Sequence, residues 1–148
     1  MKLINRDTDY ALRALIHIAK NSQRISVTEM ASKLDIPKPF LRKILQILTK
    51  KGMLNSYKGK GGGFLPAIAP KKILLTDLIN IFQGPVKFTD CIIKKRICSD
   101  IKTCPLRKRI RALEKHVVSE LKSTTLDDLI QDDASSLDKS RHRKMEEG

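Results

Sequence analysis

Three cysteines form the group of side chains best suited to bind a metal or to do redox chemistry. Cys91, Cys98 and Cys104 follow a Cys-x6-Cys-x5-Cys spacing in a segment that shows no regular periodicity. Thiolates select zinc, copper(I) or iron–sulfur clusters. Structural zinc sites usually use closer Cys-x2-4-Cys pairs, which this chain lacks. The wider spacing favours a loop around a larger object such as a cluster, although three small buried hydrophobic residues would be the simpler interpretation.

The surroundings of the cysteines favour bound negative charge. Between residues 87 and 111 the sequence has nine Lys and Arg residues against Asp90 and Asp100. Cys104 directly precedes Pro105 at an expected helix start, where the helix dipole stabilises a thiolate. This basic excess would offset the charge of a thiolate-ligated cluster.

A second candidate site lies between residues 37 and 60, which contain seven Lys and Arg residues and no acidic residue. Such a stretch can neutralise several phosphates of a nucleic acid. Arg suits the edge of guanine and Gln that of adenine, whereas glycines let a backbone approach phosphate closely. The candidate DNA-binding residues are Ser26, Thr28, Pro37, Lys38, Pro39, Phe40, Arg42, Lys43, Gln46, Lys58, Gly59, Lys60, Gly61 and Gly62. An ordinary solvated face with a glycine turn is the alternative.

The elements that must position these residues are three short helices and a hairpin. Helical spacing predicts helices over 8–20, 26–34 and 37–51, the first capped by Thr8 and the second by Ser26, with Glu29 completing a capping box. Val27, Met30, Ala31 and Leu34 should face inward on the second helix, and Leu41, Ile44, Leu45 and Leu48 on the third. Strands are expected over 53–57 and 64–68, and another capped helix over 76–82. This order predicts a mainly α winged helix-turn-helix with a small β-hairpin.

The C-terminal part predicts a long helix that begins near residues 103–105. Its apolar stripe comprises Leu106, Ile110, Leu113, Val117 and Leu121. So narrow a stripe suits one partner helix. The expected organisation is a DNA-binding domain over 1–84, a cysteine-rich loop over 85–104, a dimerisation helix with a short last helix over 105–132, and a disordered tail over 133–148.

Composition excludes several classes of protein. The 30 Lys and Arg residues against 16 Asp and Glu give a net charge of +14, which indicates a polyanionic partner. No apolar run is long enough to span a membrane, and the N-terminus does not resemble a signal peptide, so a reducing cytoplasm is expected. The three histidines lie apart from any nucleophile and base, so we do not expect an enzyme.

The chain up to about residue 132 resembles the Rrf-two family of bacterial winged-helix repressors. The matching stretches are Thr8–Arg13, Ile36–Leu48, Lys58–Phe64 and the cysteine triplet. The resemblance implies a homodimer joined by the long helix and an iron–sulfur cluster, 2Fe–2S or 4Fe–4S, near the dimer interface. It also implies DNA affinity that depends on the state of the cluster.

Two positions bear on the branch of the family. IscR-like members carry a ligand His three residues after the third cysteine, where this chain has Arg107. NsrR-like members use an Asp at the start of the first helix, donated by the other subunit, and Asp9 stands at that place. An acid that stabilises its own helix N-terminus is the alternative for Asp9. At the wing tip, Lys60 replaces the usual proline.

We therefore expect a regulator, most simply a repressor, that binds a palindromic operator and senses nitric oxide, redox state or iron–sulfur status. Its cluster ligands would be Cys91, Cys98, Cys104 and Asp9. The alternative keeps the DNA-binding module and replaces the cluster by cysteine thiols, zinc or a partner protein as the sensor.

Overall fold

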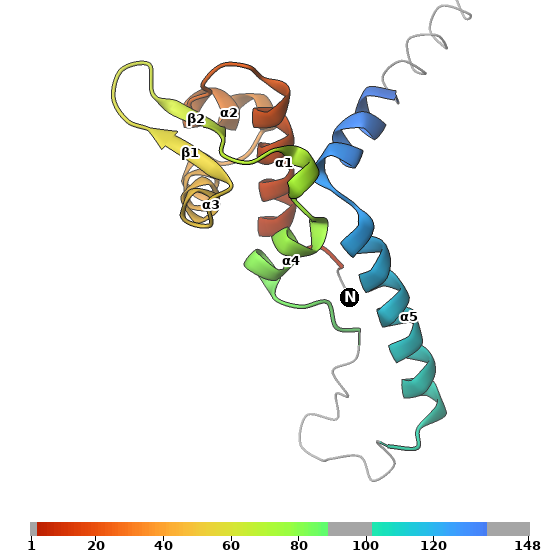
Figure 1. Ribbon diagram of the computed structural model, residues 1–148. Coiled ribbons are helices and arrows are strands. Elements are labelled where there is room, and N and C mark those ends of the chain that lie inside the picture. The colour runs from red at the N-terminus through yellow and green to blue at the C-terminus, as the bar shows by residue number, and fades with distance from the viewer. Residues whose placement is uncertain (1–2, 89–101, 136–148) are drawn as a thin grey trace, which may run out of the picture.

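The computed structural model describes residues 3–88 and 102–135. Three helices, α1 (Arg6–Lys20), α2 (Val27–Leu34) and α3 (Lys38–Lys50), precede an antiparallel hairpin of β1 (Leu54–Tyr57) and β2 (Gly63–Pro66). A short 3-10 turn, η1 (Pro70–Lys72), leads to α4 (Leu75–Gln83), and the long α5 (Pro105–Ser123) follows (Figure 1). A last helix covers residues 126–135. The structure confirms the expected mainly helical winged helix-turn-helix with a long C-terminal helix.

The first helix begins earlier than expected. Its N-cap is Asn5, whose side-chain oxygen accepts a hydrogen bond from the Thr8 backbone N–H at 2.8 Å. Thr8 is buried inside the first turn, and its hydroxyl donates to Gln83 Oε1 at 2.9 Å. The prediction that Thr8 caps the helix was therefore wrong. The Thr8 hydroxyl forms its hydrogen bond with Gln83, at the end of α4, and Asn5 is the cap.

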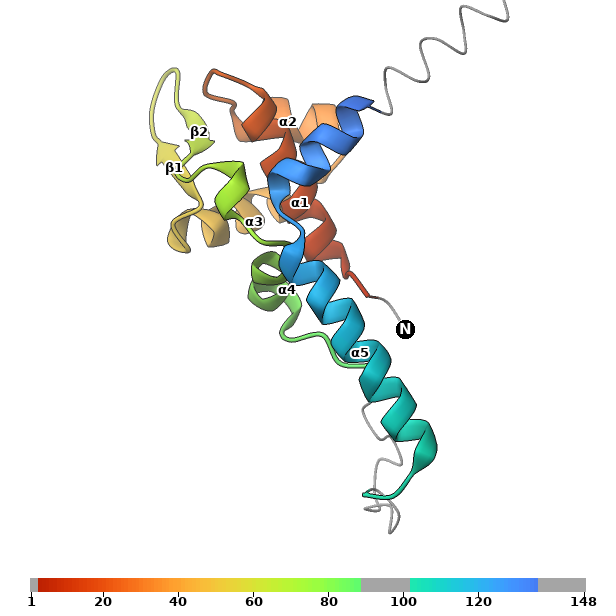
Figure 2. The ribbon, with the colours of Figure 1, turned by 45° about the vertical axis from the view of Figure 1, so that its right-hand side comes forward.

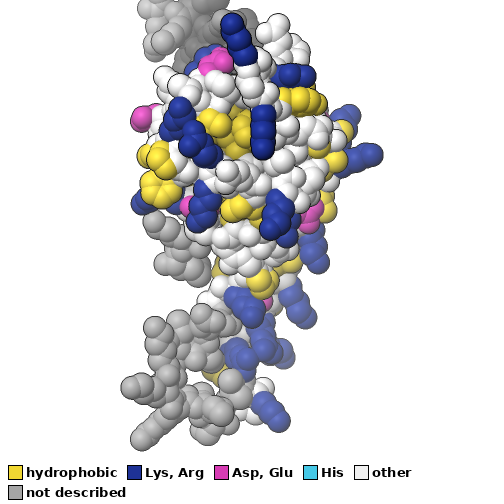
Figure 3. All heavy atoms as spheres, turned by 90° about the vertical axis from the view of Figure 1, so that its left-hand side faces the viewer, with side chains coloured by type: hydrophobic (Ala, Val, Ile, Leu, Met, Phe, Trp, Pro, Cys, Tyr) yellow, Lys and Arg dark blue, Asp and Glu magenta, His cyan; other side chains and the backbone are white. Residues whose placement is uncertain are grey.

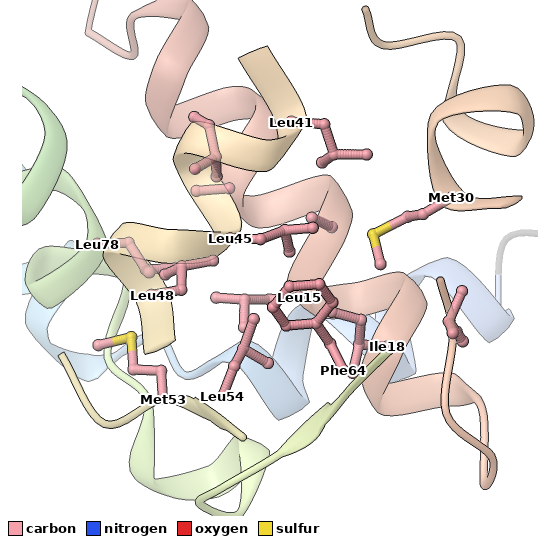
Figure 4. Packing of buried hydrophobic residues seen from close by; sticks show 14 of the residues in the cluster. Leu15, Ile18, Met30, Leu41, Leu45, Leu48, Met53, Leu54, Phe64 and Leu78 are labelled. Atoms are coloured by element: carbon pink, nitrogen blue, oxygen red, sulfur yellow. The ribbon is translucent and has the colours of Figure 1, made fainter. Parts of the chain in front are cut away.

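The core forms where α3 packs against α1. Leu41, Leu45 and Leu48 are completely buried and Ile44 almost so, as the periodicity predicted (Figure 4). Leu15 and Ile18 of α1 and Phe64 of the hairpin lie against them. On α2 the Ser26 cap is confirmed, since its Oγ accepts from the Glu29 N–H at 3.2 Å. Of the four α2 residues expected to face inward only Met30 is fully buried, and Val27, Ala31 and Leu34 lie at the rim of the core.

The hairpin is joined on its second strand by the link between α1 and α2. Ile25 pairs with Phe64 through two backbone hydrogen bonds, of 3.4 and 3.0 Å. Gly63 lies beside this bridge with φ +150°, and a Cβ at this position would stand 2.5 Å from the Ile25 carbonyl oxygen. The wing therefore has three strand-like segments, and only glycine fits at residue 63.

The long helix is attached to the rest of the fold by a backbone bridge. The Leu75 N–H donates to the Thr124 carbonyl at 3.0 Å, and the Leu126 N–H donates to the Ile73 carbonyl at 2.9 Å. This bridge fixes the start of α4 at Leu75, one residue before the expected Thr76. The helix was expected to be capped, but no side chain caps its N-terminus. The N-terminal half of α5 extends away from the core (Figures 1 and 2).

The last helix is longer than expected. Thr125 and Asp128 cap it reciprocally, and hydrogen bonds from Thr125 lower the pKa of the Asp128 carboxyl. The helix continues to residue 135. It therefore covers the first residues of the tail that was expected to begin at residue 133, and the remainder of that tail lies outside the described residues. In the two described ranges, no helix has the length and apolar character to cross a membrane.

We expect Gly63→Ala to lower the free energy of unfolding by about 3 kcal/mol, because the new Cβ adds a backbone clash to an unfavourable φ. Gly61→Ala is the matched control: φ is +75° there, but nothing lies within 4 Å of the new Cβ. That change should cost about 1 kcal/mol. Urea unfolding measures both values, and equal midpoints would contradict the proposed close approach to Ile25.

Candidate nucleic-acid interface and cysteine segment

The outward face of α3 carries unneutralised positive charge. Lys38, Arg42, Lys43 and Gln46 are all exposed, on the side of the helix opposite its buried leucines. Within residues 3–88 and 102–135, the three cations Lys38, Arg42 and Lys43 form no ion pair. Beside them Phe40 is 50% exposed, and Pro37 and Pro39 form the start of the helix. The face thus combines charge, hydrogen-bond donors and an exposed aromatic ring.

The wing tip presents two lysines on a tight glycine turn. Lys58 and Lys60 are exposed, and Gly59 and Gly61 have φ of +86° and +75°. The Gly62 N–H donates to the Gly59 carbonyl at 3.0 Å. A Cβ on Gly62 would lie 2.3 Å from the Tyr57 carbonyl oxygen. The glycines are therefore needed for the turn itself, and the lysine side chains are left pointing away from the core.

The start of α2 adds Ser26 and Thr28, both of which are exposed. The Ser26 hydroxyl oxygen is engaged as the helix cap, whereas Glu29 forms a 3.5 Å ion pair with Lys33. Figure 3 looks onto the side of the molecule that bears α3 and the hairpin. Lys and Arg side chains are spread over this face with few acidic ones between them.

Only one of the three cysteines belongs to the described residues. Cys104 has a free, half-buried thiol at the N-cap of α5, while Cys91 and Cys98 lie outside the described ranges. Cys104 lines a hollow of about 670 Å³. The basic residues that line the same hollow are Lys102, Arg107, Lys108, Arg111 and Lys115. Glu114 is the one acid among the described residues that line it, so basic side chains outnumber acidic ones and the hollow suits a thiolate or an anionic group. Arg107 occupies the place of the ligand His in IscR-like members.

Asp9 lies in the first turn of α1, where its carboxylate is exposed and 3.8 Å from the Arg13 guanidinium. The first turn of α1 and the first turn of α5 lie apart in both ribbon views. Within the described residues no three His, Cys, Asp or Glu side chains gather as a metal site. A single chain thus does not bring Asp9 and Cys104 together.

Two contacts that the sequence did not predict hold the segments next to Cys104 and Asp9 in place. The Phe88 N–H donates to Glu114 Oε2 at 2.9 Å, so the last described residue before the cysteine segment lies beside the middle of α5. Gln83 binds the start of α1 through the Asn5 N–H at 2.8 Å and the Thr8 hydroxyl. For Glu114 a signal was available, since it is the single acid in the basic first half of the helix.

Two of the five residues in the apolar stripe of α5 are exposed in one chain. Leu106 is 67% exposed and Leu113 is 61% exposed. Ile110, Val117 and Leu121 are partly buried. Within one chain, these two leucines leave apolar surface of α5 in contact with water.

Comparison with known proteins agrees with this geometry. The sequence profile of the Rrf2 family, described as an iron-dependent transcriptional regulator, matches residues 4–132. A relative from Aquifex aeolicus, named as a helix-turn-helix type transcriptional regulator, is 36% identical over 124 residues, which cover 82% of this chain and 86% of the relative. An rrf2-like regulator of Rhodobacter capsulatus is 28% identical over 138 residues, 86% of this chain and 92% of the relative.

Solved structures share the fold at lower identity. CymR, the global cysteine regulator of B. subtilis, has a TM-score of 0.70 at 24% identity, over 88% of this chain and 98% of CymR. IscR of T. potens has a TM-score of 0.69 at 22% identity, over 89% and 88%. With the family profile spanning nearly all of the described residues, this chain belongs to the Rrf2 family of DNA-binding transcriptional regulators.

Proposed function

We propose that the protein binds a palindromic operator as a homodimer, most simply as a repressor, and that an iron–sulfur cluster controls its affinity for DNA. The observation that carries the DNA-binding part is the unpaired cationic face of α3 beside a basic wing. Such a face attracts the phosphate backbone and releases its counterions.

In this proposal α3 enters the major groove. Arg42 and Gln46 read base edges, because a guanidinium fits guanine and an amide fits adenine. Lys38 and Lys43, which flank them, contact phosphates. The exposed ring of Phe40, with Pro37 and Pro39, supplies an apolar surface of the kind that contacts a thymine methyl group.

The wing and the start of α2 would hold the DNA backbone. Lys58 and Lys60 reach phosphates from the tip, where Gly59, Gly61 and Gly62 let the backbone come close. At the start of α2, Ser26 and Thr28 place backbone N–H groups toward a phosphate. These contacts set orientation, while α3 supplies sequence preference.

A second copy of the chain is the proposed cover for the α5 stripe. Leu106 and Leu113 project from a helix that extends beyond the core, so two copies can pack these rows together. The resemblance to the family supports the same arrangement. Two recognition helices related by a two-fold axis require half-sites one helical turn, or a multiple of it, apart.

The proposed cluster ligands are Cys91, Cys98, Cys104 and Asp9 of the partner subunit. The free Cys104 thiol and its basic hollow fit a thiolate-bound anionic group, and the exposed Asp9 carboxylate can reach another chain. When bound, a 2Fe–2S or 4Fe–4S cluster would supply a core that responds to nitric oxide, oxidants or iron–sulfur supply. The hydrogen bond from Phe88 to Glu114 and the position of Cys104 tie both ends of the cysteine segment to α5.

A cluster-free regulator of the same fold is the second candidate. It is favoured by the similarity to CymR, which is named as a global cysteine regulator and which also exists in an oxidised form in S. aureus. In that case the cysteine thiols, among them that of Cys104 at a helix N-terminus, would themselves be the redox-sensitive groups. Zinc or a partner protein could take the same role.

We expect Arg42→Ala to weaken operator binding by about 1–3 kcal/mol and to relax preference at one base position. Lys60→Ala is the comparison, because a phosphate contact should weaken binding to all duplexes alike and flatten the salt dependence. Fluorescence anisotropy with operator and scrambled duplexes measures both. The opposite pattern would mean that α3 and the wing are misassigned.

We expect Leu113→Glu to convert a dimer into a monomer, since the change places a charge in the apolar stripe. Lys122→Glu has the same new side chain on the exposed opposite side of α5, outside the hollow beside Cys104, and should leave the dimer intact. Sedimentation velocity measures the mass of each variant. A monomeric wild-type protein, or a dimeric Leu113→Glu variant, would contradict the proposed interface.

Protein purified without air should contain iron and acid-labile sulfide. Cys104→Ser should lose both, and Asp9→Asn should lower the retention of iron. Asp7→Asn, in the same first turn of α1, is the control and should retain the wild-type content. Iron-free wild-type protein that still binds its operator would exclude the cluster and favour the cluster-free regulator.

A further inference from the structure

An arginine outside the recognition helix and the wing tip is stacked on the wing. The guanidinium of Arg24, in the link between α1 and α2, lies 3.8 Å from the centre of the Tyr57 ring at the end of β1. Arg24 is exposed, and Tyr57 is 37% exposed. Neither residue was among those that the sequence singled out.

Strand pairing explains how two residues so far apart in sequence meet. Ile25 pairs with Phe64, and the next residue pair on the hairpin is Gly63 with Tyr57. Ile25 and Phe64 are both buried. Because successive residues of a strand point to opposite faces, the side chains of Arg24 and Tyr57 share the outer face, away from Ile25 and Phe64.

The register makes this contact a diagonal one. Arg24 lies opposite Leu65 on β2, and Tyr57 lies opposite Gly63, two residues along the same strand. A Cβ at Gly63 would stand 2.5 Å from the Ile25 carbonyl oxygen, so glycine at this position lets the link pack closely against the hairpin. The long Arg24 side chain can then reach the Tyr57 ring diagonally across β2.

The stack leaves the charge of Arg24 available. The ion pairs formed by the residues described here do not include Arg24, so no carboxylate neutralises it. A guanidinium over an aromatic face keeps the N–H donors at its edge, which can bind phosphate oxygens in pairs. The next residue after Tyr57 is the exposed Lys58, so the two cations lie on the same part of the wing.

We propose that Arg24 is a DNA phosphate-binding residue and that Tyr57 is the positioning residue that holds its guanidinium ready. This inference rests on the proposed binding of DNA and extends the contact surface from the wing tip to the link before α2. The contact is with the backbone, because a planar fork on the outer side of the wing matches phosphate and reads no base edge. The alternative is that the stack of Arg24 on Tyr57 only attaches the link to the wing and has no role in DNA binding.

The test is the affinity for duplex DNA across a range of salt concentrations, measured by fluorescence anisotropy with the full chain. Arg24→Ala should weaken binding to operator and scrambled duplexes alike by about tenfold per subunit at 0.1 M salt. The slope of log K against log salt should become shallower by about one unit per subunit. A purely structural role would not move this slope.

The two Tyr57 variants separate positioning from direct contact. Tyr57→Phe keeps the ring face and should bind like the wild type. Tyr57→Leu removes the ring while Arg24 retains its charge, so affinity should fall by less than in Arg24→Ala. Wild-type affinity in Tyr57→Leu would overturn the positioning role.

Lys122→Ala, on α5, removes one exposed charge away from the wing and should leave affinity and slope unchanged. An equal loss in this control would show that total charge, and no specific contact, sets the slope, and would overturn the proposal. A wild-type slope in Arg24→Ala would overturn it as well. If the wild type binds no duplex at all, the proposed function itself fails, and this result is distinct from a failure of Arg24 alone.

Discussion

The burial of one side of α3 decides which side chains the protein can offer to DNA. Leu41, Leu45 and Leu48 are completely buried in the core that α3 forms with α1, α2 and the hairpin, so the helix cannot rotate without exposing them. Burial of a leucine is worth about 2 kcal/mol, and three of them outweigh any gain from turning a different polar face outward. The core therefore determines the direction in which Arg42 and Gln46 point.

A second constraint links this core to the sensor part of the chain. The long helix meets the DNA-binding domain through the backbone bridge at residues 73–75 and 124–126, with Leu126 buried below it. At the other end, Phe88 and Cys104 attach the cysteine segment to the half of α5 that extends away from the core. In the proposed dimer, a change in that segment thus reaches α3 through the position of one rigid helix.

Helical periodicity was enough to predict α1 to α5 and the buried face of α3, because those signals are local. The cap of α1 was not predictable in the same way, since the Thr8 hydroxyl is hydrogen-bonded to Gln83 and not to its own helix.

The functional site was harder to predict from the sequence than the helices. Glycines and lysines of the wing are visible in the sequence, but the stacking of Arg24 on Tyr57 depends on strand register. Asp9 and Cys104 do not meet in one chain, so the joint role proposed for them would require a second copy.

The charge on α5 gives the proposed cluster a structural consequence beyond sensing. The leucine stripe shares its helix with basic side chains, among them Arg107, Arg109 and Arg111. Two such helices repel each other, and the repulsion opposes the apolar gain from covering Leu106 and Leu113. Three thiolates and a carboxylate beside the basic hollow would reduce that repulsion. Retention of a cluster and pairing of the long helices should thus stabilise each other, as linked equilibria require.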